Sequence, residues 1–401
     1  EDNEEEVLWN PFKSFDENTK NIKDVRRQAY NDTNYTVAGD FHRWDARAAT
    51  VTTLKADLTS QATPNHQIKT GCEFELKDIA NLSVTDWGST NMYVDVYGTP
   101  RKIADILGVE ENEVSDFMPE VKPKSVALYA QDKMEFESMI VNLGLRFDLY
   151  DPSARYPGDR LDPIELNEDG TRKLRKDKPE QAGVPIIKDP VDASIKYQLS
   201  PRLGISYPIT ERDKLHFTYG HYFQIPRADD LYSNLNYDMR GAIRRVGNPD
   251  LEPEKTVAYE VGVEHQFTDN LLGDVTWFSK DIDNLTDSEK VIPEDASNDY
   301  SHLKNGIYGH AQGVEITLQK RRTEKGWLSG FLSYTYSVAK GKGSSSLSGY
   351  LTSYRSQPPI TESWPLDWDQ RHVVSAAIDL RLPYGFGLNS IGQFGSGLPY
   401  T

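Results

Sequence analysis

The 401-residue sequence has 45 Lys and Arg against 62 Asp and Glu, a formal net charge of -17, and 37% apolar residues. This acidic balance argues against nucleic acid as a partner, because neutralising phosphates requires a basic surface. The lone cysteine, Cys72, excludes an intrachain disulfide framework. No stretch approaches the roughly eighteen consecutive apolar residues of a membrane-spanning helix, but a barrel that crosses a bilayer as strands needs only half of each strand to be apolar.

Residues 1–48 are polar, and we predict that they form a loop or a disordered end. The chain opens on the acidic run EDNEEE and stops at SGLPYT, without an initiator methionine, a signal peptide or a lipidation motif. We therefore expect an internal part of a longer precursor, with its folded portion in residues 49–401.

Alternation of apolar and polar residues begins at Ala49 and predicts a first pair of strands on either side of a turn at residues 63–65. In the second strand Phe74 and its alternate neighbours face one way, whereas Glu73 and its alternate neighbours face the other. The second face is too charged for the core of a small soluble domain, so we expect it to contact water.

The clearest alternation lies in residues 125–150, which read as a long antiparallel hairpin with a tight reversal at residues 137–138. Leu143 and Leu145 fall on one face of its second strand, and Arg146 and Asp148 fall on the other. Strands of about ten residues exceed the usual five or six of globular domains. Such a length is what a tilted strand needs to cross a bilayer.

The same unit recurs along the rest of the chain. Four further hairpins are predicted at residues 202–207 with 215–223, 256–267 with 271–282, 313–320 with 327–338, and 372–382 with 386–394. Together with the first two, they make twelve candidate strands. The connections between hairpins are long and polar, at residues 79–125, 151–199, 224–254, 283–311 and 340–370.

Short turns on one side and long loops on the other are typical of an outer-membrane barrel. We therefore predict an all-β fold, an antiparallel transmembrane β-barrel. A soluble sandwich or propeller is the alternative, but a propeller would show a repeat of nearly constant length, and these turns are irregularly spaced.

The alternation also predicts which side chains face lipid and which face the barrel lumen. The residues expected to face lipid are Val141, Leu143, Leu145, Val261, Val263, Ile316 and Leu318. The residues expected to line the lumen are Glu73, Arg146, Asp148, Glu260, Glu264 and Glu315.

No sequence motif indicates catalysis. HExxH, Walker and GxSxG motifs are absent. The carboxylates of residues 281–287 could attract calcium, but they lack the pattern of a helical calcium loop and favour a solvated loop tip. The acidic and basic residues of 367–372 are best explained by ion pairing that pins a loop to a strand. We predict no catalytic residue, resident metal or cofactor.

Six phrases closely resemble TonB-dependent outer-membrane receptors: ALYAQDKMEFESMIVNLGLRFDLYDP (127–152), SPRLGISYPITERDKLHFTYGHYFQIP (200–226), NPDLEPEKTVAYEVGVEHQF (248–267), NGIYGHAQGVEITLQKRR (305–322), PLDWDQRH (365–372) and SGLPYT (396–401). The resemblance is closest to members with a carboxypeptidase-regulatory-like domain ahead of the plug. It extends from about Ala49 to the end of the chain.

The resemblance implies a bacterial outer-membrane barrel of about 22 strands with a plug in its lumen. It further implies import of a scarce small ligand (a ferric siderophore, cobalamin, a glycan or a peptide), driven by a TonB-type energising complex that contacts an N-terminal region. The plug, that region and the last strands are missing from this sequence. Residues 49–401 therefore correspond to a partial barrel of about half the expected strands.

Within the long loops, Tyr232, Tyr237, Arg240, Arg244 and Arg245 lie close together in sequence, and we predict that they contact ligand. Aromatic and guanidinium groups suit a planar or anionic ligand. Taken one by one, these residues also fit an ordinary solvated loop. A soluble or surface-exposed all-β carbohydrate-binding protein remains the alternative function.

Overall fold

The structure is a computed structural model, which describes residues 43–86, 92–97, 117–118, 121–173, 185–235, 237, 245–294, 299–324, 326–345 and 362–399. Its elements are β1 (Arg43–Thr63), β2 (His66–Asp86), β3 (Met92–Tyr97), β4 (Phe117–Met118), β5 (Lys124–Phe136), β6 (Met139–Asp151), β7 (Arg155–Pro157), β8 (Pro190–Asp192), β9 (Lys196–Pro208), β10 (Asp213–Gln224), α3 (Ala228–Tyr232), β11 (Arg245–Val246), β12 (Glu254–Thr268), β13 (Leu271–Val291), β14 (Tyr300–Lys320), β15 (Leu328–Gly341), β16 (Trp364–Pro365), β17 (His372–Arg381), the 3₁₀ turn η3 (Pro383–Gly385) and β18 (Gly387–Gly395). No helix among these residues is long and apolar enough to cross a membrane.

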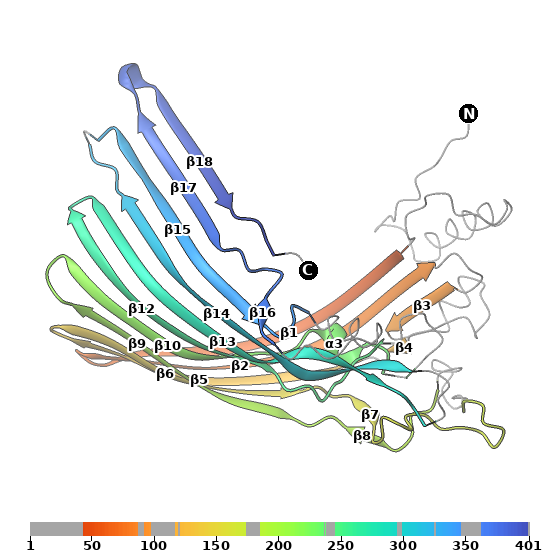
Figure 1. Cartoon of the computed structure of the whole chain (residues 1–401). Helices are drawn as coiled ribbons and strands as arrows, with labels where there is room; N and C mark the ends of the chain where they lie inside the picture. Colours follow the sequence, from red (N-terminus) through yellow and green to blue (C-terminus); the bar gives the residue numbers. More distant parts are fainter. Residues whose placement is uncertain are drawn as a thin grey trace, which may run out of the picture.

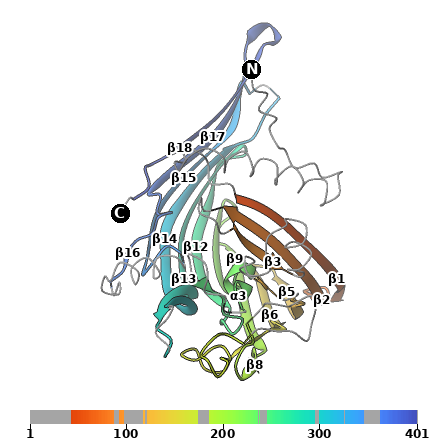
Figure 2. The same cartoon turned by 90° about the vertical axis from the view of Figure 1, so that its right-hand side faces the viewer.

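One large antiparallel sheet dominates the fold (Figure 1). Its twelve main strands pair in the order β1, β2, β5, β6, β9, β10, β12, β13, β14, β15, β17 and β18, each with its neighbour in this series. The predicted all-β antiparallel class and the consecutive strand pairing are confirmed. The sheet curves strongly but does not close: within the described residues, β1 pairs with β2 and β18 pairs with β17, and the two edge strands do not meet (Figure 2).

Tight turns and long connections lie on opposite edges of the sheet. The turns after β1, β5, β9, β12, β14 and β17 all lie along the left edge in Figure 1. The longer connections lie at the opposite edge, where Figure 1 shows β7, β8 and α3. This confirms the predicted asymmetry.

The predicted loop at residues 283–311 is wrong in its extent. β13 continues to Val291 and β14 begins at Tyr300, so most of this segment is a paired extension of the hairpin. A bulge after Ile282, where Asn284 has φ 63°, marks the point where the extension leaves the regular ladder. Apolar alternation fails beyond this point because cross-strand polar pairs, such as Glu289 opposite His302, replace it.

The strands at the beginning of the sheet are also longer than predicted. β1 starts at Arg43, before the boundary expected at residue 49, and β2 continues to Asp86, past the expected start of the first long connection at residue 79. Residues 1–42 of the expected polar end lie outside the described residues.

Strand register sorts the sheet into a charged face and an apolar face. Asp148 lies directly opposite Ala127, which lies opposite Glu73, so these three side chains share one face of the sheet. The cross-strand partners on the following strands place all six predicted lumen residues on this same face. The seven predicted lipid-facing residues lie on the other, where Leu143 is 54% exposed. So large an exposed apolar face requires a non-aqueous partner.

The charged face is the concave one. Tyr150 shares the side of β6 that carries Asp148, and its hydroxyl is hydrogen bonded to Tyr232 of α3. Figure 2 shows α3 inside the curve of the sheet. That the concave face is the lumen of a closed barrel stays a prediction.

Candidate functional site

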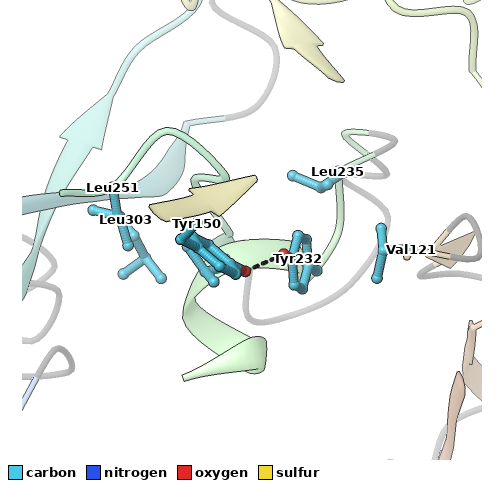
Figure 3. Packing of buried hydrophobic residues seen from close by; sticks show 7 residues of the cluster. Val121, Tyr150, Tyr232, Leu235, Leu251 and Leu303 are labelled. Atoms are coloured by element: carbon cyan, nitrogen blue, oxygen red, sulfur yellow. Dashed lines mark hydrogen bonds between the residues drawn. The ribbon is translucent and has the colours of Figure 1, made fainter. Parts of the chain in front are cut away.

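Buried side chains from the long loops pack together around α3 (Figure 3), which lies inside the curve of the sheet (Figure 2). Tyr232 donates a hydrogen bond to the Pro152 carbonyl (3.1 Å), so its hydroxyl accepts from Tyr150 at 2.5 Å. The buried apolar residues of this loop core are Val121, Tyr150, Leu231, Tyr232, Leu235, Leu251 and Leu303. Burial holds the pKa of the Tyr232 phenol well above its usual value. The loop core therefore joins three connections and β14 into one packed unit.

A second apolar cluster extends this packing along the β13–β14 extension. The rings of Tyr237 and Tyr300 meet edge to face with centroids 5.5 Å apart, packed with Ile164, Val246 and Val291. Tyr300 also donates a hydrogen bond to the Arg160 carbonyl at 2.7 Å. The extension, which apolar alternation did not reveal, is thus the support against which two loops pack.

Polar contacts tie the segment after β11 to the sheet. The Lys196 ammonium, whose side chain is 4% exposed, lies 2.9 Å from both Asp250 and Glu252. Burial opposes ionisation of Asp250, but hydrogen bonds from Ser194 and Lys196 outweigh it, and the pKa of this carboxyl is lowered. Asn248 donates to the Leu303 carbonyl at 3.0 Å. The NPDLEPE phrase therefore anchors the loop.

The predicted ligand contacts are only partly accessible. Tyr232 and Tyr237 are each 1% exposed and belong to the two apolar clusters. Arg245 forms an ion pair with Asp230 and is half-buried. Arg240 and Arg244 lie outside the described residues. Direct ligand contact stays a prediction, and it would require the loops to rearrange before either tyrosine met a ligand.

A cavity of about 340 Å³ opens on the concave wall beside the loop core. Its polar lining includes Glu73, Arg146, Asp148 and Arg202 from β2, β6 and β9. Arg146 donates through Nε to both carboxylate oxygens of Asp148, at 2.9 and 3.0 Å, and this fixes the guanidinium against the wall. Sequence alternation placed Arg146 and Asp148 on this face, but nothing local indicated that Arg202 would share a cavity with them.

The other predicted lumen residues lie further along the same face and outside the cavity lining. Glu260 accepts a hydrogen bond from the Thr218 hydroxyl at 3.2 Å, and Glu264 lies 2.8 Å from the Lys214 ammonium. Glu315 pairs in register with Thr276 on the neighbouring strand. The structure thus separates the six residues into a cavity group on β2 and β6 and an acidic group on β12 and β14.

The PLDWDQRH segment (365–372) holds the chain before β17 against the end of β15. Asp369, which is 2% exposed, accepts hydrogen bonds from the Ala339 backbone N–H and from Arg371 Nε, both at 2.8 Å. This agrees with the pinning role inferred from the sequence. The carboxylate of Asp281, considered for calcium, instead lies within hydrogen-bond distance of His310 Nδ1, at 2.6 Å. No group of three potential metal ligands occurs in the part of the chain that the structure describes.

The sequence of this chain matches one known protein family along most of its length. The family model "TonB dependent receptor-like, beta-barrel" matches residues 7–401. The chain belongs to the TonB-dependent receptors. Proteins of this family are receptors and transporters rather than enzymes. The match does not distinguish members that carry a carboxypeptidase-regulatory-like domain.

Solved structures of TonB-dependent receptors share the fold. The ferric-catecholate import receptor Fiu from K12 E. coli has 17% identity and a TM-score of 0.51, over 86% of this chain and 44% of that one. The FrpB iron transporter from Neisseria meningitidis has 13% identity and a TM-score of 0.52, over 86% and 43%. The Serratia marcescens hemophore receptor HasR, solved with its hemophore HasA and heme, has 16% identity and a TM-score of 0.51, over 88% and 51%.

The chain therefore spans about half the length of the structures that it matches. No curated protein matches it.

Proposed function

We propose that the complete protein imports a scarce small ligand across the bacterial outer membrane, without altering it chemically, using energy from a TonB-type complex. The observation that carries this proposal is the family match over residues 7–401. The exposed apolar face supports a lipid environment, and the charged concave face supports a wet lumen. Nucleic acid is not among the proposed partners.

The similar solved structures include a ferric-catecholate import receptor, a hemophore receptor with heme, a ferric citrate transporter and a copper transporter. A metal chelate is therefore the first class to test, with cobalamin, glycans and peptides next. We further propose, from the quoted phrases alone, the subtype with a carboxypeptidase-regulatory-like domain, and that the energising complex contacts a region N-terminal to this chain.

The test is uptake of radiolabelled ferric siderophores, ferric citrate and cobalamin by cells that carry the full-length gene, with and without the inner-membrane energising complex. We expect saturable uptake of one ligand class that disappears when the complex is deleted. Uptake that persists without the complex would indicate a passive porin, and turnover of the ligand by purified receptor would indicate an enzyme. A receptor that binds glycans and purifies without detergent would favour the carbohydrate-binding alternative.

A further inference from the structure

The β13–β14 hairpin has an irregular joint between its regular ladder and the extension beyond it, in which residues 286–291 pair with residues 300–305. The register shifts twice between Ile282 and Thr286 of β13. Within this stretch Asn284 has φ 63°, a left-handed conformation that asparagine tolerates. Bulges of this kind interrupt the ladder and bend the strand that carries them. The joint is therefore a point at which the extension can change its angle to the rest of the sheet.

Loop segments hold the extension on both of its faces. Tyr300 and Leu303 are three residues apart on β14, so their side chains point to opposite faces. Tyr300 packs in the cluster that contains Tyr237 and Val246, whereas Leu303 packs in the loop core with Tyr232. The extension is thus enclosed between loop segments, and its position depends on the quality of these contacts.

The contacts leave several buried polar atoms unsatisfied. The hydroxyls of Tyr237, Thr286 and Ser301 and the Nδ1 atom of His302 have no hydrogen-bond partner among the described residues. In contrast, the hydroxyl of Tyr232, which is as deeply buried as Tyr237, both donates and accepts. A buried polar group without a partner costs free energy that is recovered when water reaches it. The packing of the extension is therefore finely balanced against opening.

One side chain fastens the extension at the joint. Asn305 donates through Nδ2 to the carbonyls of Glu252 and Asn284, both at 2.8 Å, and its Oδ1 accepts from the Glu252 N–H at 2.8 Å. The Glu252 carboxylate is held in turn by the buried Lys196 ammonium at 2.9 Å. Asn284 also donates from its side chain to the Pro253 carbonyl at 3.3 Å. Asn305 therefore ties the extension both to the bulge and to the NPDLEPE segment.

We propose that the extension is a hinged flap, which opens as one unit about the bulge at Asn284, and that the Asn305 side chain is its latch. The packed arrangement is the closed form. Opening would part Tyr300 from Tyr237 and let water reach the unsatisfied hydroxyls. It would also uncover Tyr237, which the sequence predicts to contact ligand. The device belongs to the fold and depends neither on the proposed import function nor on the identity of a ligand.

The test is hydrogen exchange, read by mass spectrometry, on the purified full-length receptor in detergent. In the unmodified receptor we expect the amides of residues 286–291 and 300–304 to share one opening equilibrium and to exchange faster than those of residues 271–281 and 311–319 on the same strands. N305A should speed exchange in the extension about tenfold, because it removes three hydrogen bonds, and leave the regular ladder unchanged. N305D sets a carboxylate against two carbonyl oxygens and should speed exchange at least as much.

N167A is the matched control, because Asn167 also donates two side-chain hydrogen bonds in a long loop, to Thr171 and Arg172, neither of which belongs to the extension. It should leave exchange in the extension as it is in the unmodified receptor. Unchanged exchange in N305A would overturn the latch. Protection that falls off gradually towards the tip, or acceleration in N305A that reaches residues 311–319, would overturn the hinge. The pattern in the unmodified receptor decides the hinge even if N305A does not fold.

Discussion

His302 shows how the loop packing acts on a single residue. It is 1% exposed on the β13–β14 extension, beyond the bulge at Asn284, and lies opposite Val246 of β11 and Glu289 of β13. Burial, reinforced by the nearby Arg160 guanidinium, lowers the pKa of its imidazole to about 4. Glu289 acts in the opposite direction, and Lys304 adds to the lowering. The imidazole is therefore neutral while the loops are packed.

This burial predicts that the loop cluster loosens in acid. The imidazole binds a proton more readily when the cluster opens than when it is closed. The contribution of neutral His302 to the stability of the closed cluster is therefore complete above about pH 6.5 and is lost progressively as the pH falls towards 4. We expect protection of amide hydrogens in the extension to fall by an amount on the order of 1–2 kcal/mol between about pH 7 and pH 5. Hydrogen exchange, corrected for the pH dependence of the intrinsic exchange rates, measures this loss of protection.

H302Q is the informative variant, because the glutamine side chain is neutral throughout this pH range. Its protection should be nearly independent of pH over the same interval. Equal pH dependence in H302Q and in the unmodified protein would show that another titratable group is responsible.

At the scale of elements, loop segments are fastened to strand ends by single buried polar residues. Asp369 is the clearest case, since it joins the segment before β17 to Ala339 near the end of β15. Ser337 adds a hydrogen bond from its hydroxyl to the Gln370 carbonyl at 3.1 Å. The returning chain therefore enters the sheet at a fixed register.

Removing this fastening should destabilise the corner locally. D369A leaves the buried Ala339 N–H without an acceptor, and we expect a cost of about 1–3 kcal/mol. D367A is the matched control, because Asp367 belongs to the same phrase but is exposed. Limited proteolysis and urea unfolding of the full-length receptor measure both variants. Equal stability of D369A and D367A would contradict the pinning role.

At the scale of the whole molecule, the two faces of the sheet require different solvents. The convex face exposes alternate apolar side chains on one strand after another, whereas the concave face carries ion pairs and the wall cavity. A sheet of this kind is stable only with lipid or detergent on one side and water or polar protein on the other.

The consequence is a strong asymmetry in the cost of inserting a charge. L143R places a guanidinium on the apolar face and should cost about 2–4 kcal/mol in the bilayer. Q131R is the control at matched depth, because Gln131 lies opposite Gly144 on the charged face; it should cost much less. Urea titration of full-length receptor refolded in lipid vesicles measures both costs. Similar costs on the two faces would contradict a membrane barrel.

The sequence by itself determined the strand order, the turns and the facing of residues such as Leu143 and Asp148. These features are local: the side chains of a strand alternate with period two, and turn residues interrupt that pattern where the chain reverses. The family resemblance could also be stated from the sequence, because its phrases are contiguous runs of residues; two of them include buried anchors, Asp369 and Asn248, that fasten a loop to the sheet.

Only the tertiary structure decided the length of β13 and β14, the burial of Tyr232 and Tyr237, and the cavity at Arg202. Beyond the apolar band of the sheet, a strand need not alternate apolar and polar residues. Its pairing there depends on the partner strand and on the loops that cover it. Burial of a loop tyrosine depends in the same way on segments distant in sequence. Arg202 lies opposite a glycine on each of two hairpins, Gly144 on β6 and Gly220 on β10, a juxtaposition that exists only once those hairpins pair.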